Sequence, residues 1–336
     1  MSFNLILPFL RPIERLLLNN EISEIMGNPD SSWWYELEGK MLQEKTVYFD
    51  AARLQTGLEV IANQLGMRLD EDNPSLHAQL PDGSRIAAWI SPLVSPAPAL
   101  AIRKFTSRNY TMDDLIARGT LTQPLADFLT EQIRTGKTLL ISGGTGTGKT
   151  TLLRILADAI PNDERIVVIE DTPELQIQKP NIVPVRSQSK TFKTAISFDE
   201  LLKDALRFRP DRIILGEVRG VEARTLLDSF NTGHDGSLAT IHANSAAKAL
   251  TRFANLVMRS HAQTTFSDTE AEIGEAVDFV VHVERQPGRR VIREVLALSG
   301  YDRAARQFKS ESVYNFDSTR NLNPNHTGED KRYAIA

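Results

Sequence analysis

One segment near the middle of the chain has the residue types and spacing of a phosphate-binding loop. It reads Gly143-Gly144-Thr145-Gly146-Thr147-Gly148-Lys149-Thr150 and fills every fixed position of the Walker A pattern. Glycines in such a loop let successive backbone N–H groups point into one concavity that holds phosphate oxygens. We expect Lys149 to bridge the β- and γ-phosphates, the Thr150 hydroxyl to ligate Mg²⁺, and Thr151 to complete the nucleotide-binding set. The sequence therefore predicts a binding site for a nucleoside triphosphate.

Carboxylates follow two of the apolar segments beyond this loop. Glu170 and Asp171 follow residues 166–169, and Glu217 follows residues 212–216. Since ligands gather at the carboxyl ends of parallel strands, these side chains are expected to face the loop. A P-loop site needs one carboxylate for the metal shell and another to orient or activate the attacking water. The alternative for Glu170 or Asp171 is a helix or turn cap, but the acids together favour hydrolysis over nucleotide storage.

A third apolar segment, residues 237–241, is followed directly by His242. A histidine at the mouth of the same sheet can sense the γ-phosphate by hydrogen bonding, so His242 is a candidate site residue. His234 is a weaker candidate for the same role. Asn244 or Ser245 is expected to cap the helix that follows.

The elements that must position these residues alternate along the chain. We expect strands at 138–142, 166–169, 182–185, 212–215 and 237–241, and helices at 150–160, 198–207 and 221–231. Such alternation is typical of a parallel sheet covered by helices. Two further apolar runs, 277–283 and 291–298, are joined around Pro287-Gly288 and predict a closing hairpin. Residues 123–305 are therefore predicted to form one α/β nucleotide-binding domain.

The first hundred residues follow a different pattern. Residues 50–66 place leucine and isoleucine at helical spacing, and two short strand-like runs follow at 85–90 and 99–103. Because helices and strands do not alternate here, we expect an α+β domain over residues 1–108, with helices on one face of a small sheet. Residues 109–122 are polar and predict a linker, and residues 306–336 predict a loosely ordered C-terminal tail.

Composition narrows the class of protein. The 336 residues suit two domains of ordinary size. The absence of cysteine excludes a disulfide framework, a catalytic thiol and zinc sites built on thiolates. A net charge of −4 argues against a whole-surface nucleic-acid binder, so no direct nucleic-acid partner is expected.

The beginning of the chain is apolar but does not resemble a signal peptide. Residues 1–18 carry charges and prolines and lack the basic-then-apolar order of a secretory signal. We expect this arm to pack on its own domain or on a neighbouring subunit. The alternative is an interfacial membrane contact, since the arm contains a dense apolar cluster. The cluster consists of Leu5, Ile6, Leu7, Phe9 and Leu10.

Taken in order, these segments resemble the secretion ATPase superfamily, the hexameric motors of type II and type IV secretion, pili and conjugation. Its four boxes match Walker A at 143–150, an Asp box at 165–175, a Walker B-like box at 209–219 and a His box at 232–245. Within the superfamily the chain is most similar to the conjugative-transfer, TrbB-like ATPases. Assembly ATPases of type II secretion and type IV pili often carry a four-cysteine zinc module, so the absence of cysteine favours the conjugation and type IV secretion branch.

The resemblance implies a RecA-like P-loop NTPase domain with a parallel sheet, preceded by a smaller α+β, PAS-like domain. It implies ATP and Mg²⁺ as cofactors, with Thr150 and Glu217 in the metal shell, the latter through water. It also implies that Glu170 assists water activation and that His242 reads the γ-phosphate.

Two arginines of the first domain, Arg85 and Arg103, match family positions that reach nucleotide phosphates, although each is also compatible with ordinary strand-edge charge. The implied assembly is a homohexamer, cytoplasmic and peripheral at the inner membrane, with secretion or conjugation channel components as partners. Three alternatives remain at this point. They are a Tad-type or type IV pilus assembly or retraction ATPase, a DNA-stimulated RecA-like motor, and a nucleotide-gated scaffold without turnover.

Overall fold

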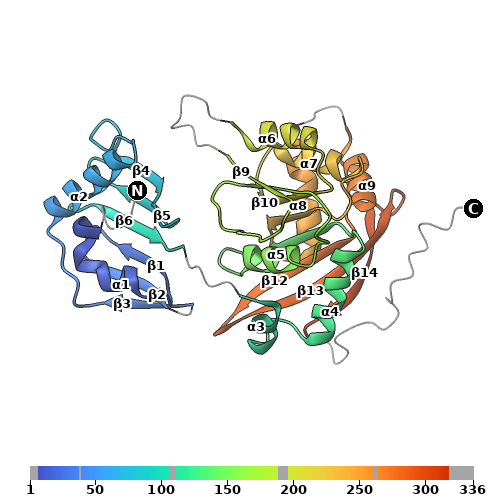
Figure 1. Ribbon diagram of the computed structural model, residues 1–336, viewed down its shortest axis with the longest axis horizontal. Helices are drawn as coiled ribbons and strands as arrows, with labels where there is room; N and C mark the ends of the chain where they lie inside the picture. Colours follow the sequence, from blue (N-terminus) through green and yellow to red (C-terminus); the bar gives the residue numbers. More distant parts are fainter. Residues whose placement is uncertain (1–6, 38, 106–109, 188–195, 261–263, 318–336) are drawn as a thin grey trace, which may run out of the picture. The chain divides into compact units, whose positions relative to one another are not determined.

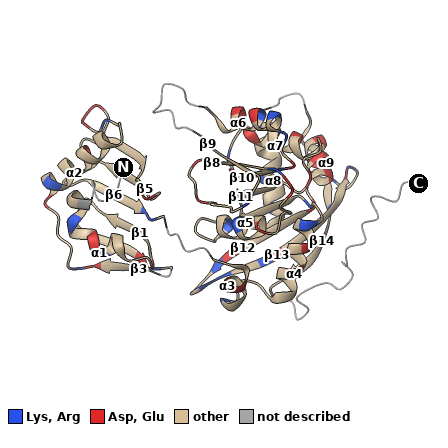
Figure 2. Ribbon diagram, viewed as in Figure 1, with Lys and Arg blue, Asp and Glu red and all other residues tan. Residues whose placement is uncertain are grey.

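The computed structural model describes residues 7–37, 39–105, 110–187, 196–260 and 264–317 (Figure 1). The chain divides into two compact units, Met1–Asn109 and Tyr110–Ala336. Each unit has its own hydrophobic core. Figure 2 shows acidic and basic residues interspersed on the elements of both units, in keeping with the small net charge.

The N-terminal unit is built on one antiparallel sheet with strand order β3-β2-β1-β6-β5-β4. Its elements are η2 (Leu7–Ile13), α1 (Glu14–Leu18), β1 (Ile22–Gly27), β2 (Trp33–Leu37), β3 (Lys40–Glu44), α2 (Ala51–Gln64), β4 (Ser75–Gln79), β5 (Arg85–Trp89) and β6 (Ala99–Arg103). The predicted helix and the two predicted strands are α2, β5 and β6. Strands β1 to β4 were not predicted. β2 and β4 each bury one side chain and β3 buries none, so the apolar pattern of these three strands is weak.

The described part of the N-terminal arm packs on its own unit. Leu10 and Ile13 have no exposed surface, and Leu16 and Leu17 are also buried in the same core. This confirms the expectation that the arm packs on its own domain for these residues. Leu5 and Ile6, which belong to the predicted apolar cluster, lie outside the described residues.

The second unit contains an eight-stranded sheet with order β14-β13-β12-β7-β11-β10-β8-β9. The strands from β12 to β9 in that order are parallel, and β13 and β14 are antiparallel to their neighbours. The strands are β7 (Leu139–Gly143), β8 (Ile166–Glu170), β9 (Ile182–Arg186), β10 (Arg212–Val218), β11 (Leu238–His242), β12 (Phe279–Gln286), β13 (Arg289–Asp302) and β14 (Gln307–Asn315). The predicted α/β class and the closing hairpin are confirmed, although the sheet as a whole is mixed.

Helices cover both faces of this sheet. They are α3 (Met112–Ala117), α4 (Gln123–Arg134), α5 (Lys149–Ala157), α6 (Phe198–Ala205) with η3 (Leu206–Phe208), α7 (Glu222–Phe230), α8 (Ala246–Met258) and α9 (Phe266–Ala276). Side chains of a strand alternate between the two faces. Leu139 and Ile141 of β7 lie in the core that contains α4 and α5, whereas Leu140 lies in the core that contains α6 to α9.

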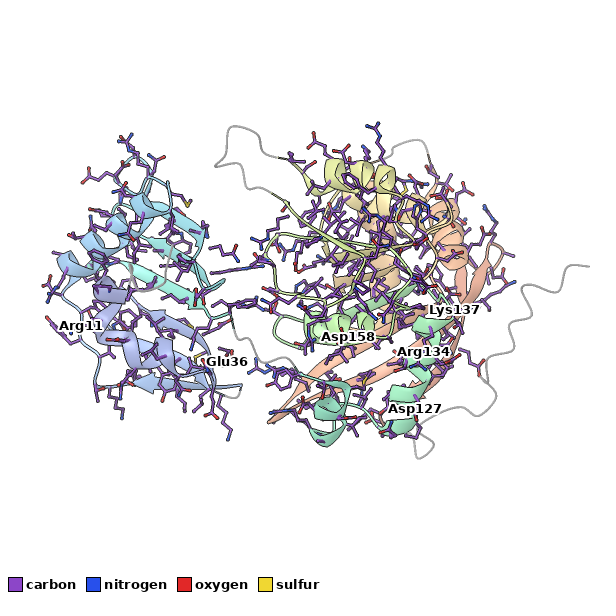
Figure 3. The ribbon with its side chains drawn as sticks, viewed as in Figure 1. Arg11, Glu36, Asp127, Arg134, Lys137 and Asp158 are labelled. Atoms are coloured by element: carbon purple, nitrogen blue, oxygen red, sulfur yellow. The ribbon has the colours of Figure 1, made fainter. Side chains whose placement is uncertain are left out.

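Helix α4 illustrates how these helices attach. Leu125, Leu129 and Ile133 follow helical spacing and have no exposed surface. Asp127 and Arg134 lie on the exposed side of the same helix (Figure 3). No helix among the described residues is long and apolar enough to span a membrane.

Two predicted irregular regions contain regular structure instead. Within the predicted linker, Met112–Ala117 form α3, whose N-terminus carries a capping box between Thr111 and Asp114 and whose Leu115 is buried. The predicted loose tail contains β14, which pairs along β13 and buries Val313 and Tyr314. The predictions of irregular structure were therefore wrong for residues 112–117, which gain order from a cap, and for residues 307–315, which gain order from a long neighbouring strand. Residues 318–336 of the predicted tail lie outside the described residues.

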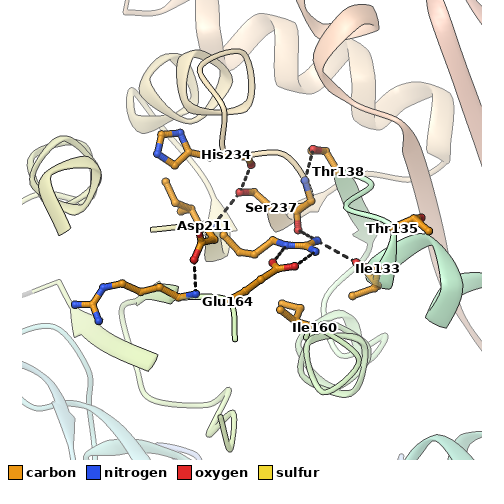
Figure 4. Close-up of polar contacts among 12 residues, drawn as sticks. Ile133, Thr135, Thr138, Ile160, Glu164, Asp211, His234 and Ser237 are labelled. Carbon is orange, nitrogen blue, oxygen red and sulfur yellow. Dashed lines mark hydrogen bonds and ion pairs between the residues drawn. The ribbon is translucent and has the colours of Figure 1, made fainter. Parts of the chain in front are cut away.

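A network of polar contacts organises the amino ends of the central strands, and Figure 4 shows Ile133, Glu164 and Ser237 among its members. The side chain of Arg212, the first residue of β10, is 3% exposed. Its Nη1 donates to the carbonyl oxygens of Ile133 and Gly236, each at 3.0 Å, and its Nη2 donates to Glu164 Oε1 at 2.9 Å. The amino half of the Walker B-like box is therefore structural, and it lies at the edge of the sheet opposite the P-loop.

His234 belongs to the same amino edge. It precedes β11, its Nδ1 lies 3.1 Å from the Ser229 carbonyl oxygen, and its own carbonyl accepts from the Ser237 hydroxyl at 2.7 Å. Because β11 runs parallel to β7, the start of β11 is far along the strand from the loop that follows β7. The weaker candidacy of His234 as a γ-phosphate sensor is therefore wrong.

Candidate active site

The predicted phosphate loop connects the buried strand β7 to the N-terminus of α5. Gly146 and Gly148 have φ values of 69° and 94°, in the left-handed region that favours glycine. A Cβ on Gly143 would lie 2.5 Å from the carbonyl oxygen of Val283 on β12, so a larger residue does not fit there. The glycines thus give the loop its backbone shape and let it lie against the neighbouring strand.

Lys149 opens α5 and folds back over the loop. Its side chain is buried, and its Nζ donates to the Gly144 carbonyl oxygen at 2.8 Å. The Thr147 hydroxyl donates to the same oxygen at 3.0 Å. The ammonium group therefore lies at the loop and beside the N-terminus of α5, both of which favour bound anions. Thr150 and Thr151 follow in the first turn of α5, and Thr145 is exposed on the loop.

Three predicted site residues lie at the same edge of the sheet as the loop. The register pairs His242 of β11 with Gly143 of β7, and Glu170 and Glu217 lie at the corresponding ends of β8 and β10. A Cβ on Gly216, the residue before Glu217, would lie 3.2 Å from the Glu170 Cβ, so the ends of β8 and β10 lie close together.

The Glu217 carboxylate is held by two side chains. His242 Nε2 lies 3.2 Å from Oε1, and Arg219 Nη2 donates to Oε2 at 2.8 Å. Arg219 Nη1 also donates to Asp171 at 2.9 Å, so one guanidinium joins two carboxylates at the ends of the neighbouring strands β8 and β10. Of the two residues predicted to cap the helix after His242, Ser245 is the cap. Its side chain accepts a hydrogen bond from Lys248 N at the N-terminus of α8.

Electrostatics keep Glu217 ionised and His242 neutral. Burial acts to raise the pKa of Glu217, but Arg219, and to a smaller extent His242 and Lys149, lower it below its ordinary value. Burial and the nearby charge of Lys149 lower the pKa of His242, and Glu217 only partly opposes this. A neutral imidazole beside a carboxylate donates through Nε2–H, because the carboxylate can only accept.

Glu170 has the opposite electrostatic character. Its side chain is buried, and burial raises its pKa to about 7 despite hydrogen bonds from the backbone N–H groups of Glu174 and Leu175. These groups donate to Oε2 at 2.9 Å and 3.1 Å, so Glu170 also caps the turn after β8. The turn-cap alternative and the water-activation prediction are compatible, since a general base works best with a pKa near the operating pH.

The donor set suits magnesium. Mg²⁺ prefers hard oxygen ligands and retains several waters, and the Thr150 hydroxyl and the Glu217 carboxylate supply such oxygens. Since both Glu217 oxygens already contact Arg219 or His242, a contact through metal-bound water fits this carboxylate better than direct ligation.

The predicted arginines of the N-terminal unit lie together on its sheet. Arg85 of β5 and Arg103 of β6 are register partners on adjacent antiparallel strands. Side chains at directly opposed positions project from the same face. Their contact with nucleotide phosphates stays a prediction.

Sequence reasoning missed a histidine and an arginine beside the loop. His282 of β12 makes a buried hydrogen bond with the Ser142 hydroxyl, at 2.9 Å, immediately before the phosphate loop. Arg290 Nε of β13 donates to the Gly146 carbonyl oxygen at 2.9 Å. Neither contact has a signal in local sequence, because each depends on the pairing of β12 with β7, residues 140 positions apart.

The fold and the site define a P-loop nucleotide-binding protein with acidic and histidine side chains at the strand ends beside the loop. Comparison with known proteins gives the family. A family model described as type II/IV secretion system protein matches residues 9–327, and the chain belongs to this family. The resemblance to secretion ATPases expected from the four boxes is thereby confirmed.

Individual relatives agree with that assignment. The chain is 36% identical over 284 residues to the conjugal transfer protein TrbB of Rhizobium radiobacter, covering 83% of this chain and 84% of the relative. It is 31% identical over 330 residues to the type IV secretion system protein VirB11 of Bartonella quintana, covering 87% and 92%. The solved structure of the ATPase DotB of Legionella pneumophila shares the fold, with a TM-score of 0.59, 19% identity and coverage of 87% and 79%.

Proposed function

We propose that this chain is an Mg²⁺-dependent ATPase that powers type IV secretion or conjugal transfer as a homohexameric ring. The family membership and the relatives named for conjugal transfer and type IV secretion support the biological role. The observation that carries the chemistry is the cluster of Lys149, Glu217 and His242 at one edge of the sheet beside the phosphate loop.

Each residue has a defined part in the proposed reaction. The loop N–H groups and Lys149 bind the β- and γ-phosphates, and Mg²⁺ bound through Thr150 offsets their charge. Glu217, ionised at neutral pH, orients a water for in-line attack on the γ-phosphorus. Glu170, with its pKa near 7, accepts a proton from that water, and neutral His242 donates a hydrogen bond to the γ-phosphate.

His242 connects the Glu217 carboxylate to the position proposed for the γ-phosphate. In the structure its Nε2–H is directed to Glu217, so contact with a γ-phosphate requires the imidazole to exchange one acceptor for another. Such an exchange would release one Glu217 oxygen at the moment when ATP is bound. Its counterpart Arg219 would continue to hold the second oxygen.

Steady-state phosphate release tests the catalytic part of the proposal. Lys149→Ala is expected to reduce turnover to background, because the ammonium group at the phosphates is lost. Lys203→Ala is the matched control: this lysine is exposed on α6 and pairs with Asp199, so turnover should stay unchanged. Turnover by Lys149→Ala equal to that of the unaltered chain would refute the proposal.

The assembly and its partners need separate tests. Sedimentation with ATP and Mg²⁺ is expected to give a sixfold species, and a monomer at working concentration would contradict the ring. Purification from the native cell is expected to retain conjugation or secretion channel proteins from the cytoplasmic face of the inner membrane. Recovery of a pilin platform protein instead would assign the chain to pilus assembly or retraction.

A further inference from the structure

The β12–β13 hairpin runs beside the phosphate loop. Val283 of β12 is the register partner of Gly143, where β7 ends and the loop begins. β12 continues to Gln286, and β13 returns from Arg289. The hairpin therefore extends past the end of β7 along one flank of the loop.

Two arginines of the hairpin contact this flank. Arg290 Nε donates to the Gly146 carbonyl oxygen at 2.9 Å, and its Cδ lies 3.4 Å from the position of a Cβ on Gly148. Arg285 Nη1 lies 3.5 Å from the position of a Cβ on Gly146. Among the residues that the structure describes, the bond to Gly146 is the one hydrogen bond of the Arg290 side chain, and Arg290 has no ion pair there.

The Arg290 bond restrains a peptide unit that glycine leaves easy to rotate. Gly146 and Gly148 both have positive φ, and glycine populates both signs of φ about equally. In a planar trans peptide the carbonyl and the next N–H point in opposite directions. Holding the Gly146 carbonyl toward the hairpin therefore directs the Thr147 N–H toward the other side of the loop, where N–H groups of such loops hold phosphate oxygens.

We propose that Arg290 is a positioning residue of the nucleotide site. It fixes the Gly146–Thr147 peptide in the orientation that binds the diphosphate group shared by ATP and ADP, and it takes no part in hydrolysis. This inference rests on the proposed function, since it requires that the loop bind a nucleotide.

Arg289 provides a matched control on the same hairpin. It is equally a surface arginine, and strand alternation directs it to the opposite face of β13. Its Nε donates to Gln286 Oε1 at 3.0 Å, and its guanidinium lies 5.1 Å from the centre of the Phe316 ring. Replacing Arg289 removes the same charge from the hairpin without removing the bond to the loop.

The test compares Arg290→Ala, Arg290→Lys and Arg289→Ala in the full chain. Calorimetric titration with ADP and Mg²⁺ should show binding about 5-fold weaker in Arg290→Ala, the size expected for an exposed charge-assisted hydrogen bond. The KM for ATP should rise by a similar factor, with kcat within about twofold, because only binding depends on the restrained peptide. Arg290→Lys retains a cationic donor and should recover more than half of the loss, and Arg289→Ala should bind as the unaltered chain does.

Contrary outcomes are distinct from failure of the proposed function. Unchanged binding in Arg290→Ala, an equal loss in Arg289→Ala, or a fall in kcat as large as the rise in KM would overturn the role of Arg290. No recovery in Arg290→Lys would overturn it as well. Absence of ADP and ATP binding by the unaltered chain would refute the proposed function instead.

Discussion

Replacing Glu170 by glutamine is expected to give a variant that is more stable than the unaltered chain but does not hydrolyse ATP. Glu170→Gln retains an oxygen that can accept from the backbone N–H groups of Glu174 and Leu175. It removes the cost of a buried negative charge and also removes the proposed proton acceptor. Stability and turnover should therefore change in opposite directions.

The size of the effect follows from the pKa. Burial raises the pKa of Glu170 from 4.5 to about 7. Between these values the folded state keeps a proton that the unfolded state has released, so stability falls as pH rises through that window. At about 1.4 kcal/mol per pKa unit, the charge costs about 3 kcal/mol above pH ~8 and about 1 kcal/mol near pH ~5. The gain in the free energy of unfolding from Glu170→Gln should thus be about 2 kcal/mol larger above pH ~8 than near pH ~5.

Urea unfolding without nucleotide, at about pH 5 and about pH 8.5, measures this difference directly. Glu131→Gln is the control, because Glu131 is exposed on α4 and its replacement should change stability little at either pH. Phosphate release by Glu170→Gln should be at least about 100-fold lower than by the natural chain. A gain in stability that is the same at both pH values would refute the reasoning about burial.

Two further predictions concern stability, each measured by urea unfolding. Gly236→Ala should lower the free energy of unfolding by about 3 kcal/mol, because the new Cβ would clash with Arg212 Nη1 and the backbone has a φ of 74°. Gly233→Ala, also at positive φ but with nothing near its Cβ, should cost only about 1 kcal/mol, and equal costs would show that the Arg212 contact is unimportant. Tyr314→Ala in β14 should cost about 3 kcal/mol, and a cost below about 0.5 kcal/mol would mean that β14 adds nothing to the core.

The central strands could be predicted from sequence because they are buried on both faces. β7, β8 and β10 each contain an uninterrupted apolar run, residues 139–141, 166–169 and 213–215, as expected for parallel strands covered on both sides. β14 was missed because most of its side chains are exposed and only Val313 and Tyr314 are buried. Its order comes from pairing with β13, which is a tertiary effect that local sequence does not encode.

The site was predictable as a set of residue types but not as a set of contacts. The Walker A spacing alone identifies the phosphate loop and Lys149, because every fixed position of the pattern serves phosphate binding. The sequence does not show that Arg219 joins Glu217 to Asp171, because Asp171 follows a different strand and lies 48 residues away from Arg219. Half of the Walker B-like box proved structural, since Arg212 ties the amino ends of the strands together.

The most direct test of the account is phosphate release by Glu217→Gln at saturating ATP and Mg²⁺. The rate is expected to be at least about 100-fold below that of the unaltered chain, because the carboxylate that orients the attacking water is lost. The dissociation constant for ADP, measured on the same preparation by calorimetry, should stay within about threefold of that of the unaltered chain, since the phosphate loop is intact. A Glu217→Gln rate close to that of the unaltered chain would contradict the claim that this strand-end carboxylate drives hydrolysis.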